Sequence, residues 1–232
     1  MRFNLPAALG CLALIFAVSV AVTRSAELMA EGPVIVPAPS YQAPASKGLE
    51  TAVFAGGCFW GVQGVFAHVT GVRSAVSGYA GGDAKTARYQ QVGTGRTGHA
   101  EAVRIVFDPT QVSYADLLRI YFSVVADPTT LNYQGPDSGT QYRTAIFPTT
   151  LEQKVMAQRY IGQLEKAGIW HNPIVTRLEA GAFYPAEAYH QDFLMRNPNH
   201  PYIRINDLPK ISALKRLFPE EYRAKPVLVN AG

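Results

Sequence analysis

Runs and alternations of apolar residues divide most of the chain into short strands and amphipathic helices. Strands are predicted at 51–55, 72–79, 102–107, 142–147 and 174–178, where apolar residues run together or alternate. Helices are predicted at 59–69, 113–127, 150–164, 186–195 and 210–218, where apolar residues recur at helical spacing. Strands and helices intermix along the chain, so the pattern predicts a two-layer α/β or α+β domain.

Polar segments separate these elements and mark where two of the helices begin. Long polar loops are predicted at 84–99 and at 129–141. Ser113 precedes one predicted helix and Asp116 follows three residues later, which is the pattern of a capping box. Thr150 precedes the next predicted helix. Both helices therefore have a definite predicted start.

The first 26 residues have the pattern of an export signal. Arg2 precedes an apolar run at 7–22, and small residues near its end favour cleavage near Ala21 or Ala26. The run has 16 residues, fewer than the roughly 20 of a membrane-spanning helix. A signal peptide at 1–26 is therefore predicted, with an uncleaved anchor at 7–22 as the alternative. A lipid-modified Cys11 is disfavoured because the apolar run continues past it. We expect an exported protein, in a bacterial periplasm.

The segment that follows the predicted signal differs in composition from the rest of the chain. Residues 27–48 include four prolines together with several alanines and serines, and this composition predicts a flexible linker. The folded domain is predicted at 49–218, with a C-terminal tail at 219–232.

The overall composition suits a soluble, well-packed domain, with 48% hydrophobic and 16% charged residues. The net charge is +4, and without residues 1–26 the balance is 19 basic to 17 acidic residues, or +2. A charge this mild, with no basic stripe, gives no reason to expect nucleic-acid binding. The two cysteines are Cys11 and Cys58, so removal of the signal would leave one thiol and no internal disulfide.

Cys58 is the most informative residue for chemistry, because it lies at the turn between a predicted strand and a predicted helix. A helix start presents unpaired N–H groups and the positive end of the helix dipole, which is expected to lower the thiol pKa and favour the thiolate. The adjoining Gly56-Gly57 pair permits a sharp turn and close approach of a substrate. Phe59 and Trp60 follow directly, which indicates a pocket for a small, apolar and polarisable group.

Two short motifs have simpler explanations than the cofactor or metal they resemble. The segment 93–98 matches G-x-G-x-x-G, but it lies between a polar loop and a strand, whereas a dinucleotide fingerprint follows a strand and opens a helix. It is expected to be a flexible loop that borders the site. His99 and Glu101 match half of the zinc deaminase signature, but the required P-C-x-x-C is absent. Since the histidines also lack ligand spacing, no metal is expected.

Spacing alone leaves three interpretations of Cys58. A thiolate paired with His99 or His190 would form a cysteine-dependent acyl-transfer site. A cysteine that is only packed in the core is the second interpretation, because free cysteines are commonly buried. A redox-active thiol is the third, and we favour it.

Three blocks of sequence favour the redox interpretation further. They are Gly57-Cys58-Phe59-Trp60-Gly61, then Gly98-His99-Ala100-Glu101-Ala102-Val103, then Gly139-Thr140-Gln141-Tyr142-Arg143. In this order they resemble the A-type peptide methionine sulfoxide reductases. The resemblance extends from about Thr51 to Pro209 and includes Asn197-Pro198-Asn199-His200-Pro201-Tyr202.

The resemblance implies an α+β fold, a two-layer sandwich with a mixed sheet and a ferredoxin-like core. It also implies reduction of methionine-S-sulfoxide, in oxidised proteins and as the free amino acid. Cys58 would attack the sulfoxide sulfur and Glu101 would protonate its oxygen, which requires a carboxyl group whose pKa is raised by desolvation. The implied substrate-binding residues are Phe59, Trp60, Tyr89, Asp137 and Tyr142.

One departure from the family pattern affects the second half of the reaction. Many members carry resolving cysteines near the C-terminus, but no cysteine follows Cys58 here. A sulfenic acid on Cys58 would therefore be reduced by an external thiol, such as a thioredoxin-like protein, a glutaredoxin or a small thiol. We expect a monomer without a bound cofactor, and a cysteine-dependent acyl-transfer enzyme remains the alternative function.

Overall fold

The computed structural model describes residues 32–44 and 46–229 of the chain, and the predicted signal lies outside them. A six-stranded sheet has the order β7-β6-β1-β3-β2-β8, in which β6 and β7 run parallel and the other neighbours antiparallel. Its strands are β1 (Glu50–Gly56), β2 (Val72–Ala80), β3 (Ala100–Phe107), β6 (Thr144–Ile146), β7 (Arg177–Leu178) and β8 (Phe183–Pro185). A separate pair is formed by β4 (Tyr133–Gln134) and β5 (Asp137–Ser138).

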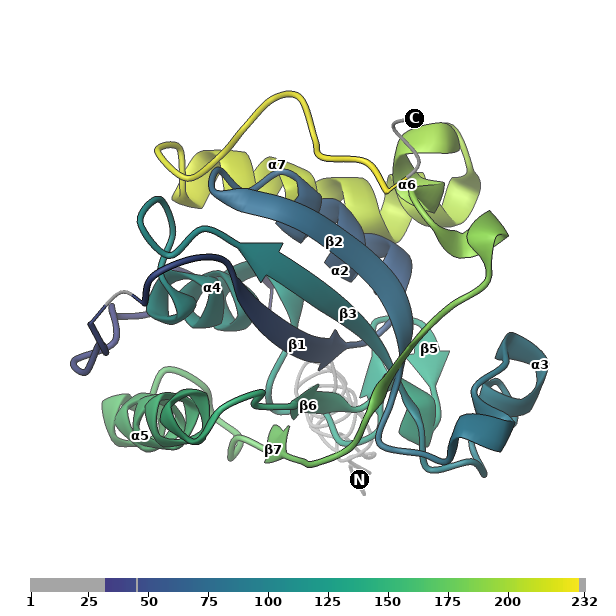
Figure 1. Ribbon diagram of the computed structural model, residues 1–232, viewed down its shortest axis with the longest axis horizontal. Coiled ribbons are helices and arrows are strands. Elements are labelled where there is room, and N and C mark those ends of the chain that lie inside the picture. Colours follow the sequence, from purple (N-terminus) through teal and green to yellow (C-terminus); the bar gives the residue numbers. More distant parts are fainter. Residues whose placement is uncertain (1–31, 45, 230–232) are drawn as a thin grey trace, which may run out of the picture. The chain divides into compact units, whose positions relative to one another are not determined.

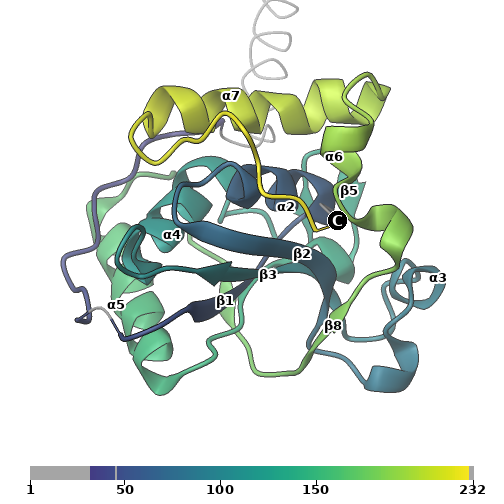
Figure 2. The same ribbon diagram turned by 45° about the horizontal axis from the view of Figure 1, so that its top comes forward.

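Helices cover one face of this sheet, and Figure 2 shows α2 lying between α7 and the strands. The α-helices are α2 (Phe59–Ala67), α3 (Tyr89–Val92), α4 (Tyr114–Ile120), α5 (Leu151–Ala167), α6 (Phe193–Arg196) and α7 (Leu208–Leu217). Tighter or wider turns form η1 (Ala84–Thr86), η2 (Tyr121–Val125), η3 (Thr140–Tyr142), η4 (Ala188–His190) and η5 (Ile203–Asp207). Within the described ranges, no helix combines the length and apolar character needed to cross a bilayer.

The centre of the sheet is a ferredoxin-like core built from two strand–helix–strand halves (Figure 1). The first half is β1-α2-β2 and the second is β3-α4-β6, and their strands interleave in the order β6-β1-β3-β2. On β1, Phe54 pairs with Val103 of β3 on one side and with Ile146 of β6 on the other. This arrangement confirms the predicted α+β fold with a mixed sheet.

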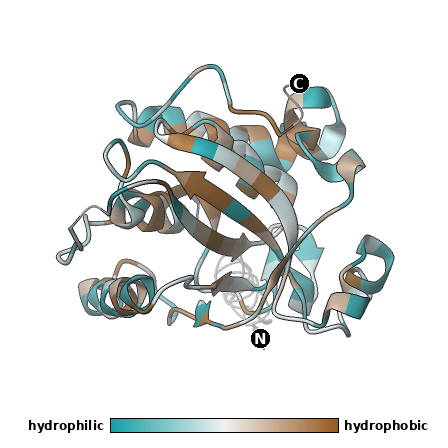
Figure 3. Ribbon diagram, viewed as in Figure 1, coloured by the Kyte–Doolittle hydropathy of each residue, from teal (hydrophilic) through white to brown (hydrophobic). Residues whose placement is uncertain are grey.

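The two faces of the sheet are packed with side chains of different size. Along β1, Ala52 and Phe54 face the large core beneath the helices, whereas Val53 and Ala55 face a smaller, alanine-rich cluster on the other side. This alternation is the period-two pattern of a strand that is buried on both faces. Figure 3 shows the resulting apolar colour along the central strands.

Part of the predicted linker packs firmly on the domain. Val36 is 1% exposed, and its carbonyl oxygen accepts a hydrogen bond from Nε of Arg119 at 3.0 Å. The hydroxyl of Tyr160 on α5 donates to the carbonyl of Pro37 at 2.7 Å. The expectation of flexibility is therefore wrong for this part of the segment, because its apolar residues complete the core next to α4 and α5.

The C-terminal tail also lies against the domain. The N–H of Arg223 donates to the carbonyl of His68, and the N–H of Val227 donates to that of Ala67. Both acceptors lie at the C-terminal end of α2, where the last carbonyls lack helical partners. The tail therefore closes the end of the helix that begins at Cys58.

The predicted helix at 186–195 is wrong as a continuous helix. The chain forms η4 and α6, which are separated by an extended Gln191 and by Asp192 at a φ of 53°. The side-chain amide of Gln191 donates to the carbonyls of Ser77 and Ala186, at 2.9 and 3.0 Å. These tertiary contacts outweigh the local helical pattern, which sequence periodicity cannot reveal.

Candidate active site

The turn between β1 and α2 presents Cys58 as the N-cap residue of α2. Gly57 precedes it at a φ of +87°, and a Cβ there would lie 2.5 Å from Cβ of Gln134. Both the left-handed backbone and the close packing therefore require glycine. The Cys58 side chain makes no capping hydrogen bond, and the residue keeps part of its surface exposed. The sulfur is thus available at the helix start.

The resting thiol of Cys58 is protonated, contrary to the effect expected from the helix start alone. Burial raises the pKa of the Cys58 thiol well above its ordinary value, and the carboxyl groups of Glu101, Asp207 and Asp137 raise it further. The backbone N–H of Trp60 lowers this pKa but is outweighed. Although part of the residue is exposed, protein atoms and acidic groups surround its sulfur.

Glu101 brings a buried carboxyl group to the same turn from the neighbouring strand β3. It is 3% exposed, and its Oε2 accepts a hydrogen bond from the N–H of Phe59 at 3.0 Å. Burial raises the pKa of Glu101 to about 8, with Asp137 acting in the same direction and the Phe59 N–H acting against it. Glu101 is therefore largely protonated at neutral pH, and it contacts the residue that directly follows Cys58.

Phe59 and Trp60 form an aromatic wall next to Cys58. The ring of Phe59 lies 5.0 Å from that of His190. Trp60 stacks on Phe193 with ring centres 3.9 Å apart and meets Tyr202 edge-on at 6.0 Å. Because these neighbours fix both rings, Trp60 offers an ordered, half-buried apolar surface at the start of α2, and Phe59, which is 1% exposed, supports it from within the core.

The remaining predicted substrate residues, Tyr89, Asp137 and Tyr142, lie in or next to the two long loops and reach the same site. Tyr89 begins α3, and its N–H donates to Glu187 at 3.0 Å. Burial raises the pKa values of Tyr89 and Tyr142, and the charges of Glu101, Cys58 and Asp137 raise both further. The structure therefore brings both hydroxyl groups within electrostatic reach of the thiol and the acid.

Several residues that complete the site were not predicted from the sequence. Tyr202 donates from its hydroxyl to Oδ2 of Asp137 and packs against Trp60. Asp207 is 1% exposed and influences Cys58 electrostatically. Tyr202 lies in the recognised block at 197–202, which was the one available signal. Asp207 follows that block, and the residues around it match no motif that indicates a chemical role.

The two histidines of the acyl-transfer alternative are engaged elsewhere. The Nδ1 atom of His99 accepts from the N–H of Gly82 at 3.2 Å, and its Nε2 lies 3.0 Å from the carbonyl oxygen of Asp83. The Nδ1 atom of His190 accepts from the Trp60 indole at 3.2 Å, which leaves the ring proton on Nε2. No hydrogen bond joins Cys58 to a histidine in the described part of the chain, so neither imidazole is placed as its base.

The glycine motif at 93–98 joins α3 to β3. It precedes a strand and opens no helix, so it lacks the context of a dinucleotide site. Residues 32–44 and 46–229 contain no group of three or more His, Cys, Asp or Glu side chains arranged to hold a metal ion.

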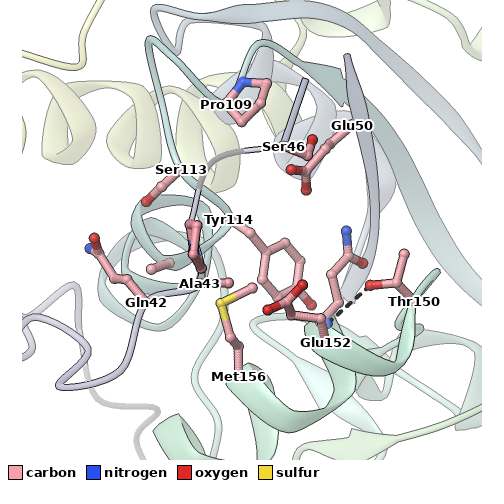
Figure 4. Close-up of a pocket in the computed structure, with 13 residues that line it drawn as sticks. Gln42, Ala43, Ser46, Glu50, Pro109, Ser113, Tyr114, Thr150, Glu152 and Met156 are labelled. Carbon is pink, nitrogen blue, oxygen red and sulfur yellow. Dashed lines mark hydrogen bonds between the residues drawn. The ribbon is translucent and has the colours of Figure 1, made fainter. Parts of the chain in front are cut away.

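A separate cavity lies at the start of α4 and is drawn in Figure 4. It has a volume of about 200 Å³ and is bounded by residues 42–44 and 46, the first residues of α4 and the N-terminal part of α5. Ser113, Tyr114 and Met156 are among its lining residues, whereas Cys58 and Glu101 are not. The cavity opens at the surface, since Gln42, Pro44 and Ser46 of its lining are exposed, and it is distinct from the site at Cys58.

The geometry suits redox chemistry at sulfur, since Cys58 has an acid next to it and no imidazole. Comparisons with known proteins agree with this class. The peptide methionine sulfoxide reductase family matches residues 50–222. The chain belongs to this family and is a methionine sulfoxide reductase of the A type, an oxidoreductase.

Individual relatives and solved structures show the extent of the similarity. The chain is 63% identical over 186 residues to peptide methionine sulfoxide reductase MsrA 2 of Mesorhizobium japonicum, covering 80% of this chain and 95% of the relative. It is 51% identical over 181 residues to the Synechocystis MsrA 2, covering 78% and 85%. Reduced Mxr1 of Saccharomyces cerevisiae has a similar structure, with a TM-score of 0.59 and 30% identity over 69% of this chain and 92% of Mxr1. Methionine sulfoxide reductase A of Corynebacterium diphtheriae has a TM-score of 0.56 and 33% identity over 74% and 89%.

Proposed function

We propose that this protein reduces methionine-S-sulfoxide, in oxidised proteins and as the free amino acid, through Cys58 and Glu101. The observation that carries the proposal is the meeting of the Cys58 thiol with a buried carboxyl group whose pKa is about 8. A sulfoxide is a weak electrophile at sulfur with a basic oxygen, so it needs a nucleophile and an acid together. The preference for the S epimer follows from the family.

The oxygen-transfer step requires one proton at the sulfoxide oxygen. The Cys58 thiolate attacks the sulfur atom of the sulfoxide, while Glu101 donates its proton to the sulfoxide oxygen. The oxygen then passes to Cys58, which becomes a sulfenic acid, and methionine is released. The methionine sulfur gains two electrons and the Cys58 sulfur loses two, so the step balances.

The substrate is held by the aromatic wall and by the surrounding hydroxyl groups. Phe59 and Trp60 offer an apolar slot for the S-methyl group. Tyr89 and Tyr142 have raised pKa values, so both keep their protons and are donors for the sulfoxide oxygen or for a water near it. Asp137 orients Tyr202 through their hydrogen bond and thereby helps to shape the slot.

An external thiol completes the cycle. Cys58 is the free cysteine of the described residues, and the sequence has no cysteine after it. A donor thiol therefore attacks the sulfenic acid and releases water, and a second thiol frees Cys58 from the mixed disulfide. A thioredoxin-like protein is the proposed donor class. The proposed setting is the periplasm, based on the apolar run at 7–22, and the proposed unit is a monomer.

The test uses the purified protein with each epimer of a peptide methionine sulfoxide and dithiothreitol. Loss of the S epimer, with the R epimer retained, is the expected result. The variant Cys58→Ser should abolish turnover, and Asp116→Asn, which lies on α4, is the matched control. If the S epimer persists, or if Cys58→Ser remains active, the proposal is wrong. Without reductant, one turnover should leave a Cys58 sulfenic acid that dimedone traps.

A further inference from the structure

Asp207 is a buried acid inside a helical segment, where η5 continues directly into α7. Its backbone is right-handed helical, with a φ of −106° and a ψ of −44°, and its side chain makes no capping hydrogen bond. The residue is 1% exposed, and its Oδ2 is buried without a hydrogen-bond partner in the described structure. A buried carboxyl oxygen without a partner is unusual, because burial of an unpaired polar group is costly.

The carboxyl group of Asp207 lies against the first turn of α2, at Gly61. A Cβ on Gly61 would lie 2.2 Å from Oδ1 of Asp207 and 2.9 Å from its Cγ, so the contact requires glycine. Cys58 and Gly61 are the N-cap and third residues of α2, the two positions whose side chains meet in a capping box. Asp207 thus supplies, from a distant segment, a carboxyl group at the position where a capping box has its acid.

Asp207 and Cys58 lie within electrostatic reach of each other, since Asp207 raises the pKa of the Cys58 thiol. Burial raises the pKa of Asp207 to about 7, Lys210 acts against this rise, and Asp137 adds to it. A large fraction of Asp207 is therefore ionised at neutral pH, whereas the Cys58 thiol is protonated. The other titratable groups that act on Cys58 or respond to it are Glu101, Asp137, Tyr89, Tyr142 and Tyr202.

Asp207 is better suited than these other groups to take the thiol proton at neutral pH. Glu101 is already protonated, and the raised pKa values of the tyrosines keep their hydroxyl groups protonated. Asp137 accepts a hydrogen bond from Tyr202. His190 has its one unprotonated nitrogen occupied by Trp60. Asp207 retains a buried oxygen without a partner, and two acids of different pKa beside one reacting atom are a common acid–base pair.

We propose that Asp207 is the proton acceptor of the Cys58 thiol, so that Asp207 and Glu101 act as the base and the acid of the same turnover. The inference rests on the proposed function. The proton of Cys58 passes to the Asp207 carboxylate, and the proton of Glu101 passes to the sulfoxide oxygen as the thiolate attacks. When the donor thiol later displaces the sulfenic oxygen, Asp207 returns its proton to form water, and the donor's proton restores Glu101.

The test compares the wild type with Asp207→Asn in single turnovers without external thiol, from about pH 6 to about pH 10. Asparagine keeps the shape and removes the base. At about pH 7, methionine should form at least ~10-fold more slowly in Asp207→Asn, given that general-base catalysis contributes about 10²–10⁴-fold. The ratio of the two rates should fall as the pH rises above about 7, the pKa of Asp207, because the base of the wild type is then fully ionised whereas the thiolate population of Asp207→Asn still grows. Glu101 affects both proteins equally and cancels in the ratio.

A purely electrostatic role would give a different result. Removal of the Asp207 charge would then lower the Cys58 pKa, and Asp207→Asn would react as fast as the wild type or faster at about pH 7. A ratio independent of pH would indicate a structural role. Either outcome overturns the inference, whereas a wild type that forms no methionine overturns the proposed function itself.

Two further variants keep the test decisive. Asp192→Asn is the matched control, because Asp192 is 2% exposed, accepts from the N–H of Val229, and has a left-handed backbone that asparagine tolerates. Its rate ratio should stay near one at every pH. If Asp207→Asn does not fold, Gly61→Ala replaces it, because the added Cβ must displace the Asp207 carboxyl group. A Gly61→Ala ratio that does not vary with pH also overturns the inference.

Discussion

The two halves of the ferredoxin-like core have the same topology but treat their strand-to-helix turns differently. In the second half, Ser113 caps α4 with a complete capping box, in which its Oγ accepts from the N–H of Asp116 at 3.1 Å and Asp116 accepts from the N–H of Ser113 at 3.0 Å. In the first half, Cys58 occupies the same position and caps nothing. The acids at this turn, Glu101 and Asp207, come from other segments.

The two turns therefore differ in what they contribute: the turn at Ser113 contributes to stability, and the turn at Cys58 contributes to chemistry. A capping box satisfies helix N–H groups locally, and each such cap contributes roughly 0.5–2 kcal/mol. At α2 the N–H of Phe59 is satisfied by Glu101 of β3 instead, so the sulfur remains available. One half therefore uses its helix start to hold the fold, and the other exposes its helix start to a substrate and surrounds it with protonatable groups.

The largest effect is expected from Glu101→Gln, which keeps the shape of the acid and removes its proton. Turnover of the S-sulfoxide should fall by about 10²–10⁴-fold, whereas alkylation of Cys58 by iodoacetamide should remain detectable. Steady-state rates and alkylation followed by mass spectrometry check both expectations. A rate within ~3-fold of the wild type would show that Glu101 is dispensable for turnover. The two helix starts would then not differ in chemistry in this way.

The second effect is a pH-dependent stability. Because Glu101 and Asp207 have raised pKa values in the folded protein, about 8 and about 7, the folded state binds their protons more tightly than the unfolded state. Their protonated forms therefore stabilise the fold at low pH, and this contribution is lost as the pH rises from about 4 through about 8.

Glu101→Gln removes the share of this pH-dependent loss of stability that comes from Glu101. Its free energy of unfolding should exceed that of the wild type by on the order of a few kcal/mol at about pH 9 and match it at about pH 4. Urea titrations at the two pH values measure this difference. Equal stability at both pH values would mean that Glu101 titrates normally in the folded protein.

The smallest effect is expected in the second half. Ser113→Ala removes the cap of α4 and should lower the free energy of unfolding by about 1 kcal/mol. Reductase activity of the folded protein should not change, since Ser113 lies at the cavity of Figure 4 and away from Cys58. Thermal melts and steady-state assays on the same sample measure both quantities. A loss of activity without a loss of stability would contradict the division between the halves.

The sequence predicted the elements that depend on local signals. The strand at 51–55, the helix start after Cys58 and the capping box at Ser113 all agree with β1, α2 and α4. The long loop at 84–99 contains the short η1 and α3, which are too brief to give a periodic signal. The edge strand β8 was missed because three residues that end in proline give little alternation.

The site was predictable where motifs carry it and was missed where long-range packing carries it. Cys58 and Glu101 lie in recognisable blocks, and the structure brings them together through the pairing of β1 with β3. The role of Asp207 depends on the contact of η5 with Gly61, which are far apart in sequence. The raised pKa of Cys58 was missed for the same reason, because a helix start alone does not reveal the acids that other segments bring to it.

The single thiol of the described chain makes Cys58 its own reporter. Cleavage after Lys47 and Arg73 places Cys58 on one peptide, free of any other cysteine. Every oxidation state of the enzyme therefore appears as a mass change on that peptide. A donor captured as a mixed disulfide would add the mass of its own cysteine-containing peptide there, so the physiological thiol donor could be identified by mass spectrometry of cell extracts.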